Sequence, residues 1–475
     1  MAVDYDLVVI GGGSGGLVVA SAAAQLKAKV ALVEKNRLGG DCLWFGCVPS
    51  KSLIHASRIA YQVQHSERFG VYTTPITINF QQAIAHVQKV IATIEPHDSP
   101  ERFEGLGVEV IFGSGQFINK NTFEINGQKL TARAFVIATG SRPAIPPISG
   151  LQESGYLTNE QVFSLTECPE SLAVIGGGPI GCELGQALHR LGTKVTLINS
   201  RSQLLPKEDP DAAKVVEQQF IQEGIKIINN TRVENIEIIE GKKAVDTGKE
   251  KILVDEILLA AGRSPNLESL NLEIAGVDYN QKGIKVNQKL QTTNPKIYAC
   301  GDVIDGYQFT HVASHEAVTV LTNALFIPFS KVNYRVIPWA TFTDPELARV
   351  GLSESEAREK YGQDICVLKQ DFTNVDRAQA EGSTMGFGKI ITKNNGEILG
   401  AHLVGKAAGE LIHEIVLAMS NNLKVSALTG IHIYPTLSEV NSKTALLLKK
   451  QKFAQNIRLQ NLLNQFFRLM RSLIH

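Results

Sequence analysis

Two stretches of the chain share one pattern of apolar and small residues. Each has a short uncharged run, residues 7–10 and 172–175, then a glycine cluster and then a stretch typical of a helix. Residues 7–26 carry no charge and are long enough for a membrane span, but five glycines in one cluster interrupt them. The pattern therefore predicts a strand, a turn and a helix, and it does so twice.

The remaining pattern indicates an α/β chain with a different C-terminal part. Apolar runs at residues 134–138 and 297–300 end in tight turns and predict buried strands. From about residue 338 the pattern changes to strands, such as residues 387–392, followed by a long helix around residues 410–421. This part is predicted to be an α+β domain.

Composition excludes several classes of protein. A length of 475 residues suggests about three domains, and a hydrophobic content of 44% is that of an ordinary globular chain. Lysine and arginine number 47, as do aspartate and glutamate, so we expect no nucleic-acid partner. Six cysteines are too few for a disulfide scaffold. Asp4 and Asp6 stand where a secretory signal would be basic, which predicts a cytoplasmic protein.

Both glycine clusters match G-x-G-x-x-G between a strand and a helix, the context of a dinucleotide-binding turn. The glycines allow a tight turn, a close approach of the backbone to a pyrophosphate and close packing of the helix on the strand. The phosphates then lie at the helix N-terminus. The candidate residues are Gly11, Gly13 and Gly16 in the first cluster and Gly176, Gly178 and Gly181 in the second.

The two predicted nucleotide sites differ at the position that meets the ribose. Glu34 follows the second strand of the first site, and its carboxylate can accept both ribose hydroxyls. The equivalent of Glu34 in the second site is Asn199, and Arg201 follows. Because Arg201 can meet a 2′-phosphate, we expect NADPH at the second site, with NADH as the alternative. An exposed loop arginine with no such role is the competing interpretation.

Cys42 and Cys47 lie close together just after the first glycine cluster. A structural zinc site usually needs a second pair of ligands, and the other cysteines are scattered singly. A reversible disulfide is the better interpretation. Pro49 marks a helix start, which would lower the pKa of the Cys47 thiol.

These motifs together resemble the class I flavoprotein disulfide reductases, which include dihydrolipoyl dehydrogenase, glutathione reductase and mercuric reductase. The resemblance covers nearly the whole chain and rests on the cysteine motif, on both glycine clusters and on further motifs in the family's order: Ala138–Gly140, Gly262–Asn266, Gly301–Asp302, Phe342–Glu346 and Tyr434–Glu439.

The resemblance implies two Rossmann-like nucleotide-binding domains and a C-terminal α+β dimerisation domain in a homodimer. The FAD domain would comprise residues 1–146 and 268–335, the NAD(P) domain 147–267, the dimerisation domain 336–452 and a tail 453–475. It also implies cofactor contacts and no resident metal. For FAD these are Gly11, Gly13, Gly16, Glu34 and Asp302, and for NAD(P)H they are Gly176, Gly178 and Gly181. Further candidate cofactor-binding residues are Lys51, Thr139, Gly140, Gly262 and, as argued above, Asn199 and Arg201.

The resemblance further implies a path for the electrons. Hydride passes to FAD, the flavin reduces the Cys42–Cys47 disulfide, and the dithiol reduces the substrate. Cys47 would be the thiolate against the flavin and Cys42 the interchange thiol. Lys51 and Glu183 would form the family's ion pair near the flavin. Without the resemblance, Glu183 would be interpreted as an acidic residue on the surface of a helix.

One position departs from the pattern of the reductases of lipoamide and glutathione. They carry a histidine, their acid–base, five residues before a glutamate, and here Tyr434 stands five residues before Glu439. A phenol with a pKa of about 10 is a poor base at neutral pH. The resemblance implies that Tyr434 and Glu439 complete the partner subunit's site. His432 is nearby, and we do not expect it to substitute for the missing histidine.

Tyr434 and the run Asp376–Ala378 resemble a mercuric-reductase-like subgroup, but the cysteine pair at the C-terminus of mercuric reductases is missing. The expected function is therefore electron transfer through Cys42 and Cys47 to a disulfide, a metal ion or a related small substrate. The alternatives are dihydrolipoyl dehydrogenase or glutathione reductase activity, and a slow redox-sensing or membrane-docked flavoprotein.

The last 27 residues hold six lysines and arginines and no acid. Apolar residues recur there at helical spacing, among them Ile457, Leu462, Phe466, Leu469 and Leu473. We expect this stripe to pack on the dimerisation domain or on the partner subunit. The alternative is peripheral contact with an anionic membrane.

Overall fold

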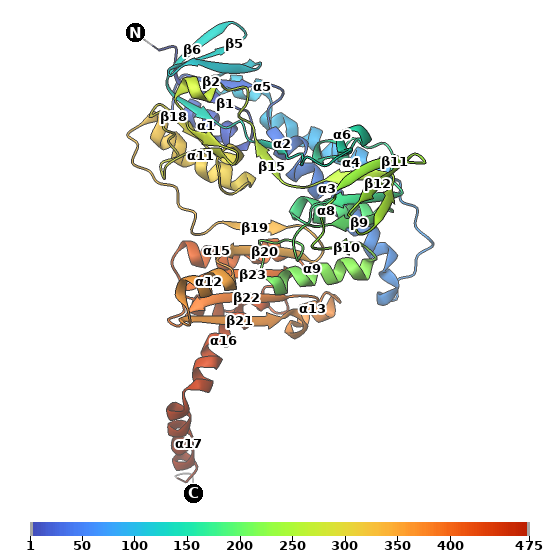
Figure 1. Cartoon of the computed structure of the whole chain (residues 1–475). Coiled ribbons are helices and arrows are strands. Elements are labelled where there is room, and N and C mark those ends of the chain that lie inside the picture. Colours follow the sequence, from blue (N-terminus) through green and yellow to red (C-terminus); the bar gives the residue numbers. More distant parts are fainter. Residues whose placement is uncertain (1–2, 473–475) are drawn as a thin grey trace. The chain divides into compact units, whose positions relative to one another are not determined.

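The computed structural model describes residues 3–472, which form two compact units. The first unit contains residues up to Arg201 and Ile225–Asn333, and the second contains Ser202–Gly224 and the chain from Tyr334 onward (Figure 1).

The first sheet of the first unit has seven strands. Leu7, Val8 and Val9 of its central strand are fully buried, as expected of a parallel strand covered on both faces. Val8 lies beside Ala31 on one side and Phe135 on the other, both in parallel register. The order is β3 (Val108–Phe112), β2 (Val30–Glu34), β1 (Tyr5–Ile10), β6 (Gln128–Ile137), β5 (Thr122–Ile125) and β4 (Gly115–Asn119), with β18 (Ile297–Ala299) also on β6.

The second sheet of this unit is parallel and has four strands in the order β10 (Lys226–Ile228), β9 (Lys194–Ile198), β8 (Ser171–Ile175) and β14 (Glu256–Leu259). The first unit also contains smaller antiparallel sheets. They are formed by β11 (Asn235–Ile239), β12 (Lys242–Asp246) and β13 (Lys251–Val254), by β7 (Ser141–Pro143) and β15 (Arg263–Pro265), and by β16 (Tyr279–Asn280) and β17 (Gly283–Ile284).

The helices of the first unit follow its strands, and the helix α1 packs against α11. Residues 7–26 form β1, a turn and α1, as predicted. The helices are α1 (Ser14–Gln25), α2 (Gly40–Trp44), α3 (Cys47–Gln64), α4 (Phe80–Ile94), α5 (Pro100–Gly105), α6 (Leu151–Ser154), α7 (Asn159–Val162), α8 (Pro179–Arg190), α10 (Leu272–Ala275) and α11 (Thr310–Leu325).

The second unit is built on a five-stranded antiparallel sheet in the order β19 (Pro338–Thr341), β20 (Glu346–Gly351), β23 (Ile398–Gly405), β22 (Phe387–Lys393) and β21 (Ile365–Asp371). Its helices are α9 (Pro210–Glu223), α12 (Glu354–Tyr361), α13 (Asp376–Ala380), α14 (Ala408–Leu411), α15 (His413–Ser420), α16 (Glu439–Gln455) and α17 (Ile457–Ser472). The long helix expected around residues 410–421 is thus two consecutive helices, α14 and α15. The predicted mixture of α/β domains and a C-terminal α+β domain is confirmed.

The sequence assigned residues 202–224 to the NAD(P) domain, but this segment packs in the second unit. Its helix α9 contacts β20 and β23, and Asp209 and Asp211 at its start bind the buried Lys389 ammonium at 2.9 and 2.7 Å. These contacts join positions far apart in the sequence, so no local pattern reveals them.

Among the residues that the structure describes, no helix is long and apolar enough to cross a membrane.

Candidate active site

The two cysteines lie on consecutive helices. Cys42 is in α2, and Cys47 is the first residue of α3, after Gly46. Both are free thiols. The thiol of Cys42 hydrogen-bonds to Cys47 and lowers the pKa of Cys47 to about 6, assisted by the Thr310 hydroxyl and the Lys51 charge. The same hydrogen bond raises the pKa of Cys42. The hydrogen bond between the two cysteines therefore favours the thiolate on Cys47 and keeps the proton on Cys42.

Thr310 is a contact that the sequence did not reveal. It begins α11, and its Oγ1 lies 3.4 Å from the Sγ of Cys47. Cys47 and Thr310 are 263 positions apart. No motif marks Thr310 as a partner of a thiolate, so only the fold identifies it.

Lys51 and Glu183 form an ion pair in which Lys51 Nζ lies 2.8 Å from Glu183 Oε2. Lys51 is one turn beyond Cys47 on α3, and Glu183 is on α8, which packs against α3. The Glu183 side chain is only 7% exposed, so it is not the surface acid that its helix alone suggests. The ion pair places a cation beside the thiolate and neutralises a buried carboxylate.

A polar network connects the residue before Cys42 to Asp302. Arg263 lies 3.4 Å from Asp41 and 3.5 Å from Asp302, measured from guanidinium nitrogen to carboxylate oxygen. Ser141 donates to Asp302 at 2.7 Å and accepts from Arg263 at 2.7 Å. Burial raises the pKa of Asp302, and the hydrogen bond from Ser141 opposes this. The sequence singled out Asp302 but not Arg263, Asp41 or Ser141.

The first glycine cluster is shaped for close backbone contact. Gly11 has φ of +109°, and a Cβ there would overlap the Ala138 carbonyl; a Cβ at Gly16 would overlap the Gly11 carbonyl. Gly13 precedes α1, whose N-terminus has no side-chain cap, and a Cβ there would meet only Gly40 Cα at 3.9 Å. Glu34 accepts hydrogen bonds from the Gly12 and Asn36 amides, each at 2.8 Å. These features fit a dinucleotide with its phosphates at α1.

The second cluster repeats this geometry. Cβ atoms at Gly176 and Gly181 would overlap the carbonyls of Ala260 and Gly176, whereas Gly178 faces open space at the uncapped start of α8. The buried Asn199 donates to the carbonyl of Arg201 at 3.2 Å, and the Arg201 side chain is exposed. Asn199 therefore shapes the loop that carries Arg201, and the cluster fits a second dinucleotide.

The other predicted cofactor residues lie where the chain crosses between the two sheets. Thr139 donates to the Asn266 carbonyl at 2.9 Å, and the Asn266 amide donates back to the Thr139 carbonyl at 2.9 Å. Gly140 and Gly262 have φ of +66° and +122° and face open space, flanking the paired strands β7 and β15.

Tyr434 lies in the second unit, where its hydroxyl donates to Asp376 Oδ2 at 2.9 Å. This hydrogen bond raises the pKa of Tyr434. Both residues belong to the motifs that suggested the subgroup, but their contact was not predicted.

His432 contacts Glu414 and the Gly430 carbonyl, and Glu439 has one buried carboxylate oxygen without a hydrogen bond in the described part of the chain. The Nε2 of His432 lies 2.9 Å from Glu414, and its Nδ1 lies 2.9 Å from the Gly430 carbonyl. Glu439 begins α16, and its Oε2 is buried without a hydrogen-bond partner in the part of the chain that the structure describes. That His432 does not substitute for the missing histidine stays a prediction.

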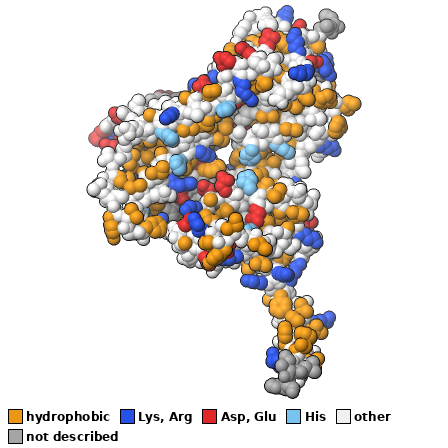
Figure 2. All heavy atoms as spheres, turned by 180° about the vertical axis from the view of Figure 1, so that it is seen from behind, with side chains coloured by type: hydrophobic (Ala, Val, Ile, Leu, Met, Phe, Trp, Pro, Cys, Tyr) orange, Lys and Arg blue, Asp and Glu red, His pale blue; other side chains and the backbone are white. Residues whose placement is uncertain are grey.

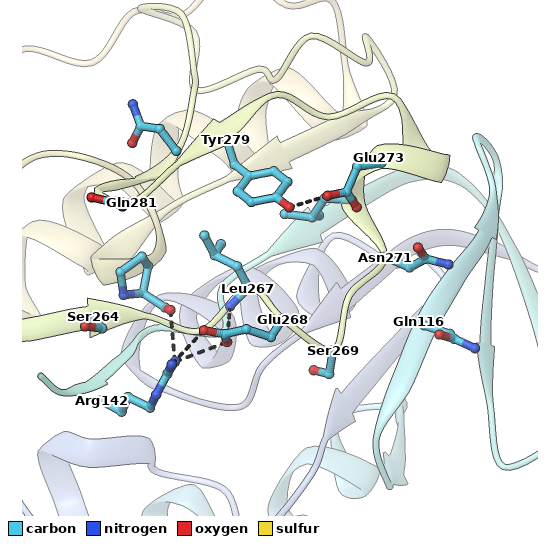
Figure 3. Close-up of a pocket in the computed structure, with 13 residues that line it drawn as sticks. Gln116, Arg142, Ser264, Leu267, Glu268, Ser269, Asn271, Glu273, Tyr279 and Gln281 are labelled. Atoms are coloured by element: carbon cyan, nitrogen blue, oxygen red, sulfur yellow. Dashed lines mark hydrogen bonds and ion pairs between the residues drawn. The ribbon is translucent and has the colours of Figure 1, made fainter. Parts of the chain in front are cut away.

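A surface pocket of about 720 Å³ in the first unit contains none of the predicted site residues (Figure 3). On its wall, Nη2 of Arg142 forms an ion pair with Oε1 of Glu268 at 2.6 Å, and the hydroxyl of Tyr279 donates a hydrogen bond to Glu273. Because Arg142 is already paired with Glu268 and no cysteine among the described residues lines the pocket, its wall provides neither a free charge at Arg142 nor a thiol.

Comparison with known proteins now decides the family. The profile of the pyridine nucleotide-disulphide oxidoreductases matches residues 5–317, and that of their dimerisation domain matches residues 337–445. The chain belongs to this family.

Relatives in the family have different substrates in their names. The chain is 36% identical over 456 residues to a mercuric reductase of Staphylococcus aureus, covering 94% of this chain and 83% of that protein. It is 36% identical to a dihydrolipoyl dehydrogenase of Geobacillus stearothermophilus, covering 94% and 96%. The solved structure of the HOCl-induced flavoprotein disulfide reductase RclA from Escherichia coli has a TM-score of 0.85 and 30% identity, covering 93% of this chain and all of that one.

The chain is thus a flavoprotein disulfide reductase, an enzyme that uses FAD and NAD(P)H and carries a dimerisation domain that supports a homodimer.

Proposed function

We propose that this enzyme transfers electrons from NADPH through Cys42 and Cys47 to a thiophilic metal ion. The observation that carries the proposal is the thiol–thiolate pair, in which the pKa of Cys47 is lowered to about 6 and that of Cys42 is raised. When bound at the first glycine cluster, FAD supplies the two-electron chemistry that reduces this pair.

The residues around the pair hold its charge and its proton. Lys51 and Thr310 stabilise the Cys47 thiolate, Glu183 fixes the Lys51 ammonium, and Cys42 keeps the proton. Oxidation of both sulfurs to a disulfide releases two electrons and the proton of Cys42; the two electrons reduce one Hg(II) ion to Hg(0) or two Cu(II) ions to Cu(I). Arg263 holds the helix α2, which carries Cys42, through an ion pair with Asp41.

The missing imidazole favours a metal ion over a disulfide substrate. Attack of Cys42 on a disulfide needs a base to remove its proton, and Tyr434, with its pKa raised by Asp376, is a poor base. A soft cation displaces a thiol proton by binding the sulfur, so it needs no base. The mercuric reductase and the Cu(II) complex of RclA among the similar proteins support this substrate class.

The test is anaerobic NADPH oxidation by the purified holoenzyme with Hg(II), Cu(II), lipoamide or glutathione disulfide. We expect metal-dependent turnover that Cys42→Ser and Cys47→Ser abolish. Lipoamide turnover should be at least about a hundredfold slower, the factor that general acid–base catalysis supplies. Tyr434→His should raise lipoamide turnover because Glu439 is retained, whereas Tyr434→Phe should leave it low. Lipoamide or glutathione turnover equal to that with metal would overturn the proposal.

A further inference from the structure

The C-terminal helix α17 is separated from α16 by Asn456. This residue has φ of −93° and ψ of 75°, which is not helical. Its side chain accepts a hydrogen bond from the Leu459 amide at 3.0 Å, as an N-cap residue does. Gln460 donates back to the carbonyls of Phe453 and Ala454 at 2.7 and 2.9 Å. The helix α17 is therefore a separately capped element (Figure 1).

The side chains of α17 divide into an apolar and a polar face. At about 100° of rotation per residue, the apolar side chains fill an arc of about 160°. Ile457, which the sequence placed on the apolar stripe, falls on the polar side, and Leu473 lies outside the described residues. The apolar face consists of Leu459, Leu462, Leu463, Phe466, Phe467, Leu469 and Met470; the polar face carries Arg458, Asn461, Asn464, Gln465, Arg468 and Arg471.

The apolar face is not covered by its own subunit. None of the described residues of α17 is buried, and the exposed fractions of Leu462, Phe466 and Leu469 are 63, 51 and 59%. Hydrophobic side chains gather along this helix in the space-filling view (Figure 2). The expectation that the stripe packs on the same subunit's dimerisation domain is therefore wrong. An apolar face of this size marks an interaction surface.

Position and charge decide between a second copy of the chain and a lipid surface. The family's dimerisation profile ends at residue 445, before α17 begins, so the helix lies outside the part that the family shares for dimerisation. A second copy would bring six further cations and no acid to a segment with six cations of its own. Anionic head groups complement this charge, and acyl chains complement the apolar face.

We propose that α17 docks this enzyme on the surface of an anionic phospholipid bilayer. The helix lies in the interfacial plane, with its leucine, phenylalanine and methionine side chains among the acyl chains. Arg468 and Arg471 face the phosphates, and Lys449, Lys450 and Lys452 of the preceding helix end extend the basic segment. The inference is independent of the substrate of the reductase.

The test is flotation of the full-length holoenzyme with vesicles of phosphatidylcholine alone or mixed with phosphatidylglycerol. We expect at least about tenfold more bound enzyme on the anionic vesicles, and release at high salt. The variant N461L/L462N/Q465F/F466Q exchanges neighbours across the two faces and keeps composition and charge. It should lose binding while NADPH oxidation is unchanged. The matched control N461Q/Q465N alters only the polar face and should bind as the native protein does.

Three results would overturn the proposal. The first is equal flotation with neutral and anionic vesicles. The second is undiminished binding by the exchange variant. The third is a combined result: the native protein does not bind vesicles, and deletion of residues 456–475 changes the oligomeric state measured by sedimentation velocity.

Discussion

Lys51 and Cys47 lie one turn apart on α3, and the ion pair of Lys51 with the buried Glu183, at 2.8 Å, holds the ammonium beside the thiolate. The arrangement separates two tasks. Glu183 keeps the cation in place, and the cation lowers the pKa of Cys47. The charge of Lys51 also offsets that of Glu183, because Glu183 by itself raises the pKa of Cys47.

Replacing Lys51 by methionine should raise the pKa of Cys47. The ordinary thiol pKa is lowered here to about 6, in part by the Lys51 charge, so its removal disfavours the thiolate. We expect a rise of about one unit. The measurement is the pH dependence of iodoacetamide alkylation of the reduced enzyme, with Cys47 followed by peptide mass spectrometry.

Lys51→Arg is the control, because it keeps the charge and should leave the alkylation profile near that of the native enzyme. An unchanged profile in Lys51→Met would show that the ion pair has no influence on the thiolate.

The hydroxyl of Thr310 should contribute to the same pKa independently. Thr310→Val keeps the shape of the side chain and removes the hydrogen bond to Cys47 Sγ at 3.4 Å. The pKa of Cys47 should rise by about one unit, as expected for a hydrogen bond to a charged group. Thr310→Ser retains the hydroxyl and should restore the native alkylation profile. If valine and serine behave alike, the contact is only steric.

How much of the fold and of the site the sequence could predict depended on how far apart the interacting residues are along the chain. The turns at Gly11 and Gly176 were predicted because strand, glycines and helix are contiguous. The pair of Lys51 and Glu183 spans 132 positions, and only the resemblance to a family suggested it. Thr310 carries no local signal, and Arg263 stands in the motif Gly262–Asn266 without any sign of its contact with Asp41. Both contacts arise only when folding brings α11 and β15 to the helices that carry the cysteines.

Two glycines that face open space allow the nucleotide sites to be tested separately. Gly13→Ala and Gly178→Ala each add a methyl group at an uncapped helix start without overlapping the protein, as the nearest heavy atoms are 3.9 Å away or beyond 4 Å. Gly13→Ala should therefore fold but retain less flavin, measured as the ratio of flavin to protein absorbance. Gly178→Ala should keep its flavin and raise KM for NADPH. Equal flavin loss in both variants would contradict the assignment of the two sites.

Arg201 should determine the preference for NADPH. Its side chain is exposed on a loop shaped by Asn199, where the first site has Glu34 instead. Arg201→Ala should raise KM for NADPH about tenfold by removing a charge-assisted contact with the 2′-phosphate, and should leave KM for NADH unchanged. Ser200→Ala is the neighbouring control. The idea fails if the native enzyme uses both nucleotides equally well or if the variant keeps its KM for NADPH.

Lys389 should contribute strongly to the stability of the second unit. Its ammonium is 3% exposed and contacts Asp209, Asp211 and Glu354. Lys389→Met leaves these carboxylates without their buried cation and should lower the free energy of unfolding by about 3–5 kcal/mol. Lys369 contacts the same Asp211 at 2.9 Å but is 39% exposed, so Lys369→Met should cost less than about 1 kcal/mol.

Urea unfolding followed by the fluorescence of Trp339 measures this difference. Trp339 donates to Glu208 at 2.7 Å in the second unit, and Trp44 is the other of the two tryptophans, so a Trp44→Phe background isolates the signal. Equal losses of stability in the two lysine variants would mean that burial does not strengthen the contacts of Lys389. A larger loss in Lys389→Met would tie the segment 202–224 to the C-terminal sheet, because Asp209 and Asp211 belong to that segment.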